Sequence, residues 1–218
     1  MRKTILVIIG IVVFLEAIFL YNTSVHEKDE LKTKRAIQKQ ISYEKQLGPL
    51  FDLLKNKEAV IELDLGALGF KTIPKEIKYF TNLEKLGLSK MYLKEIPIEI
   101  SQFKKLKILD LSNNLLLKIP RSIGELENLE QLDVSFNKIR YLPDELKNCK
   151  QLKNLYLEHN AILLFPKNIG NIPSLEILDL GHNRLIGTSF KNDLGPNFPN
   201  LKELDLEYNR LNTVELSF

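Results

Sequence analysis

The chain has 218 residues, 44% of them hydrophobic, which is enough for one or two domain cores. Its 31 basic and 28 acidic residues give a formal net charge of +3 and are spread along the sequence. Because there is no block of basic residues to follow a phosphate backbone, we expect no nucleic-acid partner.

Residues 1–24 are predicted to engage a membrane. Arg2 and Lys3 precede an unbroken apolar run from Ile5 to Leu15, and after Glu16 the apolar character continues over residues 17–21. This length is near the lower limit of about 17 to 25 residues for a spanning helix. Two interpretations are open, an uncleaved signal anchor and a cleaved signal peptide, and the lack of an A-x-A cleavage motif favours the anchor. Either one places the rest of the chain outside the cytoplasm, membrane-anchored or secreted.

Residues 25–58 are predicted to form a charged helical spacer followed by an N-terminal capping helix. Leu47, Leu50, Phe51 and Leu54 are spaced i, i+3, i+4 and i+7, which is typical of an amphipathic helix. We expect their apolar face to cover the first unit of the segment that follows.

Residues 59–218 form seven tandem repeats with a period of 23 residues. Self-similarity at a fixed period of this size is typical of solenoids. The last repeat begins 26 residues after the sixth. The repeats open at Val60, Leu83, Leu106, Leu129, Leu152, Leu175 and Leu201.

Each repeat carries the pattern of a short strand followed by a turn. Two leucines two residues apart share one face of a strand, so each repeat has an apolar inner face and a polar outer face. One repeat cannot bury its own apolar face, so neighbouring repeats are expected to stack into a parallel sheet over a continuous core. Asparagine follows the strand in five repeats and is expected to bond backbone groups there, and proline marks where five repeats turn to the opposite side. Cys149 falls in an apolar column and is therefore predicted to be a core residue. Because it is the only cysteine, the chain cannot form an intramolecular disulfide.

The motif L-x-x-L-x-L-x-x-N-x-L-x-x-I/L-P, nearly complete from Leu106 onward, resembles the leucine-rich-repeat family. The resemblance implies an α/β leucine-rich-repeat solenoid, a horseshoe with a parallel sheet on its concave face and short 3₁₀ or helical segments on its convex side. The proline-containing 23-residue form resembles repeats common in bacterial proteins and in intracellular signalling scaffolds. Extracellular animal and plant members generally carry cysteine-rich caps, so their absence favours a bacterial cell-envelope protein.

The outward strand positions are the expected binding surface. Aspartates recur between the two core leucines, and aromatic or histidine side chains precede the asparagine in the later repeats. The aspartates are either a common choice at this position in such repeats or a surface for a basic partner. The aromatic and histidine side chains are either an ordinary variable surface or a binding hot spot. The predicted ligand-binding residues are Asp110, Asp133, Phe136, Tyr156, Glu158, His159, Asp179, His182, Asp205 and Tyr208.

These features predict a non-catalytic module that binds a protein or peptide ligand. The sequence has no phosphate loop, nucleophile elbow or HExxH motif, so we assign no catalytic residue, metal or cofactor. The alternatives are a structural or adhesive envelope protein, an intracellular signalling scaffold, and a metal or pH-sensitive site at His159 and His182. The last repeat lacks a polar capping unit, so a homodimer through that end is a further possibility.

Overall fold

The computed structural model describes residues 34–38, 47–187 and 198–211. The chain divides into two units between Gly48 and Pro49. In the first unit residues 34–38 are helical and exposed, and the predicted anchor at residues 1–24 lies outside the described residues. Among the described residues, no helix combines the length and the apolar character that crossing a membrane requires.

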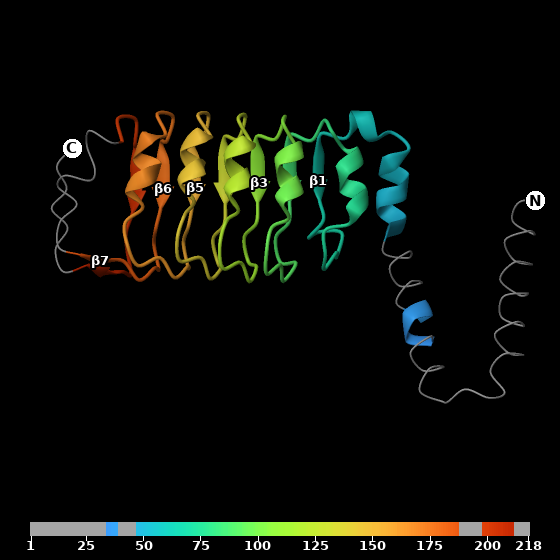
Figure 1. Cartoon of the computed structure of the whole chain (residues 1–218), viewed down its shortest axis with the longest axis horizontal. Helices are drawn as coiled ribbons and strands as arrows, with labels where there is room; N and C mark the ends of the chain where they lie inside the picture. Colours follow the sequence, from blue (N-terminus) through green and yellow to red (C-terminus); the bar gives the residue numbers. More distant parts are fainter. Residues whose placement is uncertain (1–33, 39–46, 188–197, 212–218) are drawn as a thin grey trace, which may run out of the picture. The chain divides into compact units, whose positions relative to one another are not determined.

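The second unit is built on a parallel sheet of seven strands in chain order, β1-β2-β3-β4-β5-β6-β8. Figure 1 shows the strands side by side along the stack. Each strand is only three residues long and pairs in register with the equivalent residues of the next repeat, as Leu109 pairs with Leu132. The parallel sheet has one strand in each of the seven predicted repeats. The strands are Glu62–Asp64, Lys85–Gly87, Ile108–Asp110, Gln131–Asp133, Asn154–Tyr156, Ile177–Asp179 and Glu203–Asp205.

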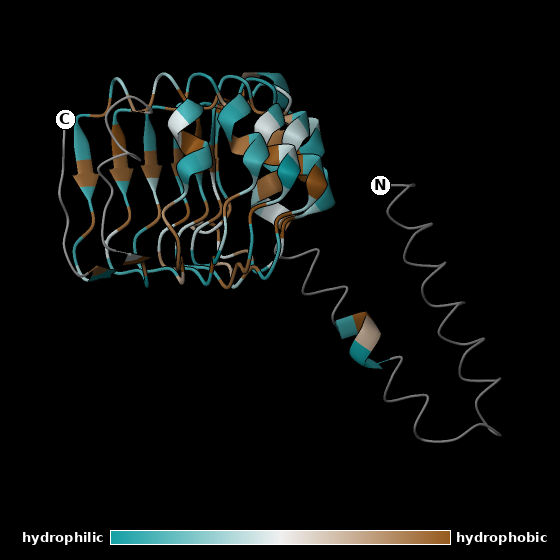
Figure 2. Cartoon of the chain, turned by 60° about the vertical axis from the view of Figure 1, so that its left-hand side comes forward, coloured by the Kyte–Doolittle hydropathy of each residue, from teal (hydrophilic) through white to brown (hydrophobic). Residues whose placement is uncertain are grey.

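A row of five 3₁₀ helices, each following a proline, forms the layer opposite the sheet (Figures 1 and 2). Each begins directly after a proline, whose φ lies between −64° and −79°. Proline thus marks the change of direction, as predicted. After the short η1 (Lys57–Ala59), these helices are η2 (Lys75–Tyr79), η3 (Ile98–Gln102), η4 (Arg121–Glu125), η5 (Asp144–Asn148) and η6 (Lys167–Asn171).

The core lies between these two layers. The central leucine of each strand from β1 to β6 is at most 3% exposed. The apolar column that closes the 3₁₀ layer is also buried, including Phe80 and Cys149 at 0%. The Cys149 thiol donates a hydrogen bond to the carbonyl oxygen of Ile123 at 3.3 Å, and burial raises the thiol pKa to about 11. Cys149 is a core residue, as predicted.

Buried asparagines connect consecutive repeats. Asn137 Nδ2 donates to the carbonyl oxygen of Leu111 in the preceding repeat at 3.0 Å, and Asn137 Oδ1 accepts from the amide of Leu116 at 2.9 Å. The loops bury backbone groups that no strand pairs, and the asparagine supplies their partners. The same arrangement recurs at Asn114, Asn160, Asn183 and Asn209.

The two ends of the stack differ from its middle. Residues 47–54 are helical, with Leu47 and Leu50 buried, but Phe51 exposes 51% of its surface, so its expected burial is wrong. The capping role of this helix stays a prediction. At the other end, Leu204 of β8 is only half-buried, and β7 (Ile186–Gly187) pairs with β9 (Arg210–Leu211) in a separate two-stranded sheet. Residues 188–197 and 212–218 lie outside the described residues.

Candidate functional site

The candidate site is the face of the seven-stranded sheet that points away from the core, called here the sheet face. The strands from β3 to β6 bury their central residue and leave the two flanking side chains half-exposed. All ten predicted ligand-binding residues lie on this face or in the turn directly after it. The last residue of each strand forms the aspartate column: Asp64, Gly87, Asp110, Asp133, Tyr156, Asp179 and Asp205.

Four rings stack on one another along the edge of the sheet face. The ring centroids of Phe136 and His159 are 4.3 Å apart, those of His159 and His182 are 4.1 Å apart, and those of His182 and Tyr208 are 4.2 Å apart. The planes of neighbouring rings differ by 12° to 24°. We call these four residues the aromatic ladder. The structure thus joins the predicted aromatic strip into one continuous stack.

Every residue of the aromatic ladder has a left-handed backbone, with φ between 50° and 54°. This conformation lets the amide of Phe136 donate to the carbonyl oxygen of Glu158 in the next repeat at 2.9 Å, and His159 and His182 repeat the bond. Apart from glycine, asparagine, aspartate and histidine, residues rarely adopt it, and it costs roughly 1 to 2 kcal/mol per residue, so it is least expected at Phe136 and Tyr208. An asparagine, which Asn113 supplies one repeat earlier, would satisfy the backbone at lower cost. The rings are therefore not what this turn requires.

The aspartate column has a structural role as well. Oδ1 of Asp110, Asp133, Asp179 and Asp205 accepts a hydrogen bond from the amide two residues later at 2.7 to 2.9 Å. This is the turn bond that aspartate and asparagine both favour. The bond accounts for an aspartate or asparagine at these positions, but it does not account for the negative charge.

Two carboxyls of this column lie in unfavourable surroundings. Burial raises the pKa of Asp133, and the negative charges of Asp110 and Glu158 raise it further, while hydrogen bonds from Ser135 oppose the shift. Burial likewise raises the pKa of Asp179, with Asp205 and Glu158 adding to the effect and the amide of Gly181 opposing it. The negative charge therefore accumulates across neighbouring strands.

Glu158, His159 and His182 offer metal-ligating atoms that all lie within 4.8 Å of one another. A bound metal lies in the plane of each imidazole along its nitrogen lone pair, and a tetrahedral ion needs those directions to converge. The two rings are instead stacked, with planes 12° apart. Both histidines would have to leave the aromatic ladder to bind one ion, so we assign no metal here.

A column of alternating charge, not noticed in the sequence, borders the sheet face on its other side. Within it, three lysine–glutamate pairs meet at 2.8 Å across neighbouring repeats. The recurrence of opposite charges 23 residues apart in the sequence could have revealed this column. Such exposed pairs are each worth at most about 1 kcal/mol. We call this set the charged column: Glu84, Lys107, Glu130, Lys153, Glu176 and Lys202.

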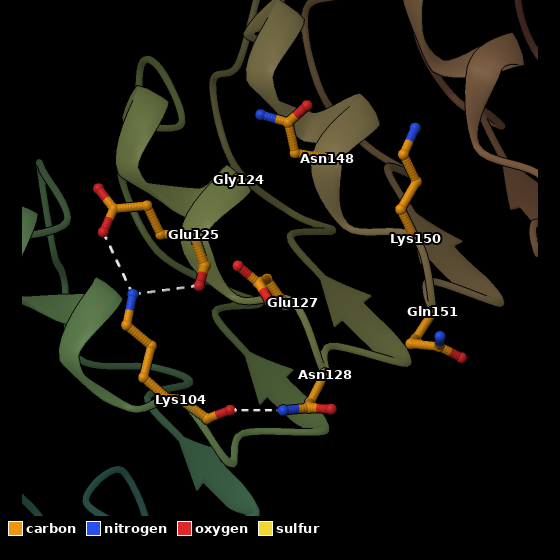
Figure 3. A pocket seen from close by; sticks show the side chains of 8 residues that line it. All are labelled: Lys104, Gly124, Glu125, Glu127, Asn128, Asn148, Lys150 and Gln151. Carbon is orange, nitrogen blue, oxygen red and sulfur yellow. Dashed lines mark hydrogen bonds and ion pairs between the residues drawn. The ribbon is translucent and has the colours of Figure 1, made fainter.

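The surface has a hollow on the sheet face and another on the 3₁₀ side. A hollow of about 740 Å³ lies over β5, β6 and β8, and its lining includes Tyr156, Asp179 and Asp205. A second, of about 640 Å³, lies beside η4 and η5 (Figure 3). There Lys104 Nζ bonds a carboxylate oxygen of Glu125 at 3.2 Å, and no predicted site residue lines it. The sheet face is therefore the better candidate site.

Comparison with known proteins identifies relatives of this repeat stack. A family model described as a leucine-rich repeat region matches residues 99–217. None of the curated proteins matches the chain significantly.

Three solved structures illustrate the similarity. A leucine-rich-repeat protein of Leptospira interrogans is 33% identical with a TM-score of 0.64, and the match covers 76% of this chain and 47% of that one. The leucine-rich-repeat ectodomain of the Arabidopsis thaliana membrane receptor kinase GASSHO1/SCHENGEN3, solved in complex with Casparian strip integrity factor 2, is 33% identical with a TM-score of 0.56, covering 64% and 17%. A plant ice-binding protein is 30% identical with a TM-score of 0.51, covering 64% and 53%. The chain thus spans about half or less of each relative.

Proposed function

The chain belongs to the leucine-rich-repeat family, and we propose that it is a non-catalytic module whose sheet face binds a protein or peptide ligand. The observation that carries this proposal is the aromatic ladder. Phe136 and Tyr208 expose 44% and 71% of their surface, in a backbone conformation that favours asparagine or glycine. Exposed aromatic side chains are enriched among the residues that dominate binding energy at protein interfaces. The receptor ectodomain solved with a bound factor supports this use of a related stack.

A selection from a random peptide library tests the proposal. Peptides are selected on the wild-type chain, and their affinities are measured by fluorescence anisotropy for two double variants. Phe136→Ala/Tyr156→Ala removes rings from the sheet face. Tyr79→Ala/Tyr141→Ala is the matched control, since these tyrosines are exposed but lie outside the sheet.

The first pair is expected to weaken binding by at least about tenfold, which corresponds to 1.4 kcal/mol, while the control pair has little effect. Circular dichroism checks that both variants keep their fold. Equal affinities of the two variants for every selected peptide would refute a binding role for the sheet face.

The proposal includes a membrane-tethered position outside the cytoplasm. The support is the apolar run from Ile5 to Leu15 behind Arg2 and Lys3, a charge arrangement that keeps the N-terminus cytoplasmic. Cell fractionation combined with protease accessibility tests it. A repeat unit that resists external protease in intact cells and becomes sensitive only after lysis would contradict this topology.

A further inference from the structure

We infer that the C-terminal half of the sheet face recognises a cationic peptide segment that presents lysine or arginine side chains to Tyr156, Asp179 and Asp205. This inference rests on the proposed function and specifies the chemistry of its ligand. It is carried by the charge of the face, by the hollow over the last strands, and by the absence of any need for that charge in the fold.

From β3 onward, six of the ten residues in the aspartate column and at the position two residues further along the chain are acidic. From β3 onward these two positions contain no lysine or arginine, although the whole chain carries a net charge of +3. We call these carboxylates the acidic band: Asp110, Asp133, Glu158, Asp179, Asp205 and Glu207.

Within the described part of the chain no lysine or arginine pairs with the acidic band, and its Glu158 meets His159 Nε2 at 3.4 Å. There, none of its aspartates lies within 4.0 Å of a basic nitrogen, whereas the charged column beside it is paired at 2.8 Å. Like charges on neighbouring strands destabilise a sheet. Burial raises the pKa of Asp133 and of Asp179, and this crowding of negative charge adds to the effect. A cationic partner would relieve it.

The turn bond leaves part of each aspartate available. In Asp179 and Asp205 that bond uses Oδ1, to the amides of Gly181 and Glu207 at 2.9 and 2.7 Å. Among the described residues no hydrogen bond reaches the second oxygen of either carboxylate. Asparagine would make the same turn bond without a charge. Neighbouring strands of a sheet lie about 4.8 Å apart. The free carboxylate oxygens of Asp179 and Asp205 can therefore accept hydrogen bonds from one ammonium or guanidinium group.

The hollow over β5, β6 and β8 fits such a side chain. Its lining combines the ring of Tyr156 and the apolar side chain of Ile177 with the carboxylates of Glu203, Asp205 and Glu207. Lysine and arginine bury their methylene stems on apolar surface and keep their charged ends among polar groups. A ring face within about 6 Å adds a cation–π contribution. The lining of the hollow includes Tyr156 and no residue of the aromatic ladder, so Tyr156 is the ring that supplies this contact.

The test uses two labelled nonapeptides, in which four lysines or four glutamates alternate with glycine, titrated against the chain by fluorescence anisotropy. Asp179→Asn/Asp205→Asn removes two charges and keeps the turn bonds. Glu99→Gln/Glu127→Gln is the matched control, because it changes the net charge equally at exposed positions on the 3₁₀ side. Amide chemical-shift changes in the wild type locate the bound peptide.

The lysine peptide is expected to bind and to shift the amides around Tyr156, Asp179 and Asp205, while the glutamate peptide does not bind. Two partly desolvated ion pairs predict a loss of about tenfold in affinity for the aspartate variant and less than about twofold for the control. Equal losses in both variants would show diffuse electrostatic attraction and overturn the inference. Absence of binding by the lysine peptide would overturn it as well.

The library peptides separate this inference from the proposed function. If their affinity depends on Phe136 and Tyr156 but is unchanged in the Asp179→Asn/Asp205→Asn variant, the sheet face binds peptides and the inference of a cationic ligand is wrong. If no selected peptide depends on Phe136 and Tyr156, the proposed function itself is wrong.

Discussion

Asn113 and Asn114 are adjacent in sequence, but their substitution by alanine is expected to have very different effects. Asn113 is exposed and has a left-handed backbone with φ of 56°. Asn114 is 5% exposed, and its Oδ1 accepts hydrogen bonds from the amides of Met91 and Leu93 at 3.1 and 3.0 Å. Its Nδ2 donates to three carbonyl oxygens, those of Leu88, Leu111 and Ser112.

The expected free-energy cost follows from these bonds. Asn114→Ala leaves the amides of Met91 and Leu93 buried without a partner, at about 1 to 3 kcal/mol each, so the loss is about 2 to 6 kcal/mol. Asn113→Ala loses the lower strain of asparagine in a left-handed backbone, about 1 kcal/mol, and the long hydrogen bond that Asn113 Nδ2 donates to Ser112 Oγ at 3.4 Å. The first substitution removes a connection between repeats, and the second changes only a surface turn.

Urea unfolding followed by circular dichroism measures both variants. Their m-values must equal that of the wild type for the comparison to report stability alone. A difference of less than about 1 kcal/mol between Asn114→Ala and Asn113→Ala would refute the view that buried asparagines hold the repeats together.

Three further predictions concern stability, pH and reactivity. Tyr208→Asn is expected to leave the free energy of unfolding within about 1 kcal/mol of the wild type, because relief of the left-handed backbone offsets the lost stacking on His182; a loss above about 2 kcal/mol in urea unfolding would make the ring structural. Asp133→Asn/Asp179→Asn is expected to match the wild type near pH 3 and to exceed its stability at pH 7. Folding raises the pKa of both carboxyls, so their ionisation above about pH 4 lowers the stability of the wild type; a difference between the two chains that does not widen from pH 3 to 7 would contradict this. The Cys149 thiol, with its pKa raised to about 11, is expected to resist iodoacetamide in the folded chain at pH 8 and to react in urea, as mass spectrometry would show.

Much of the fold could be predicted because its determinants repeat. Leu109 and Leu132 occupy equivalent positions 23 residues apart, and a core shared between neighbouring repeats requires both to be buried. Phe51 was misplaced because helical periodicity identifies one face of a helix and cannot say how far the neighbouring structure covers that face.

The site was predictable in its position but not in its geometry. Sequence spacing placed Phe136 and His159 on neighbouring repeats, since the period applies to outward residues as much as to core residues. The left-handed backbone of both residues depends on a hydrogen bond to the next repeat. No sequence pattern indicates that conformation at an aromatic residue. The hollow beside Tyr156 arises from side chains of several strands together, so no single repeat contains it.

Because of the charged column, the stability of the stack should depend on whether the number of repeats changes by an odd or an even number. The charges of its side chains alternate in sign from Glu84 to Lys202, so the charge pattern along this edge recurs every two repeats. Loss or duplication of a single internal repeat would bring two lysines or two glutamates together on neighbouring strands, where like charges are unfavourable. Loss or duplication of two adjacent repeats would restore the alternation. Variants of this stack that are lengthened or shortened should therefore be more stable with even changes in repeat number than with odd ones.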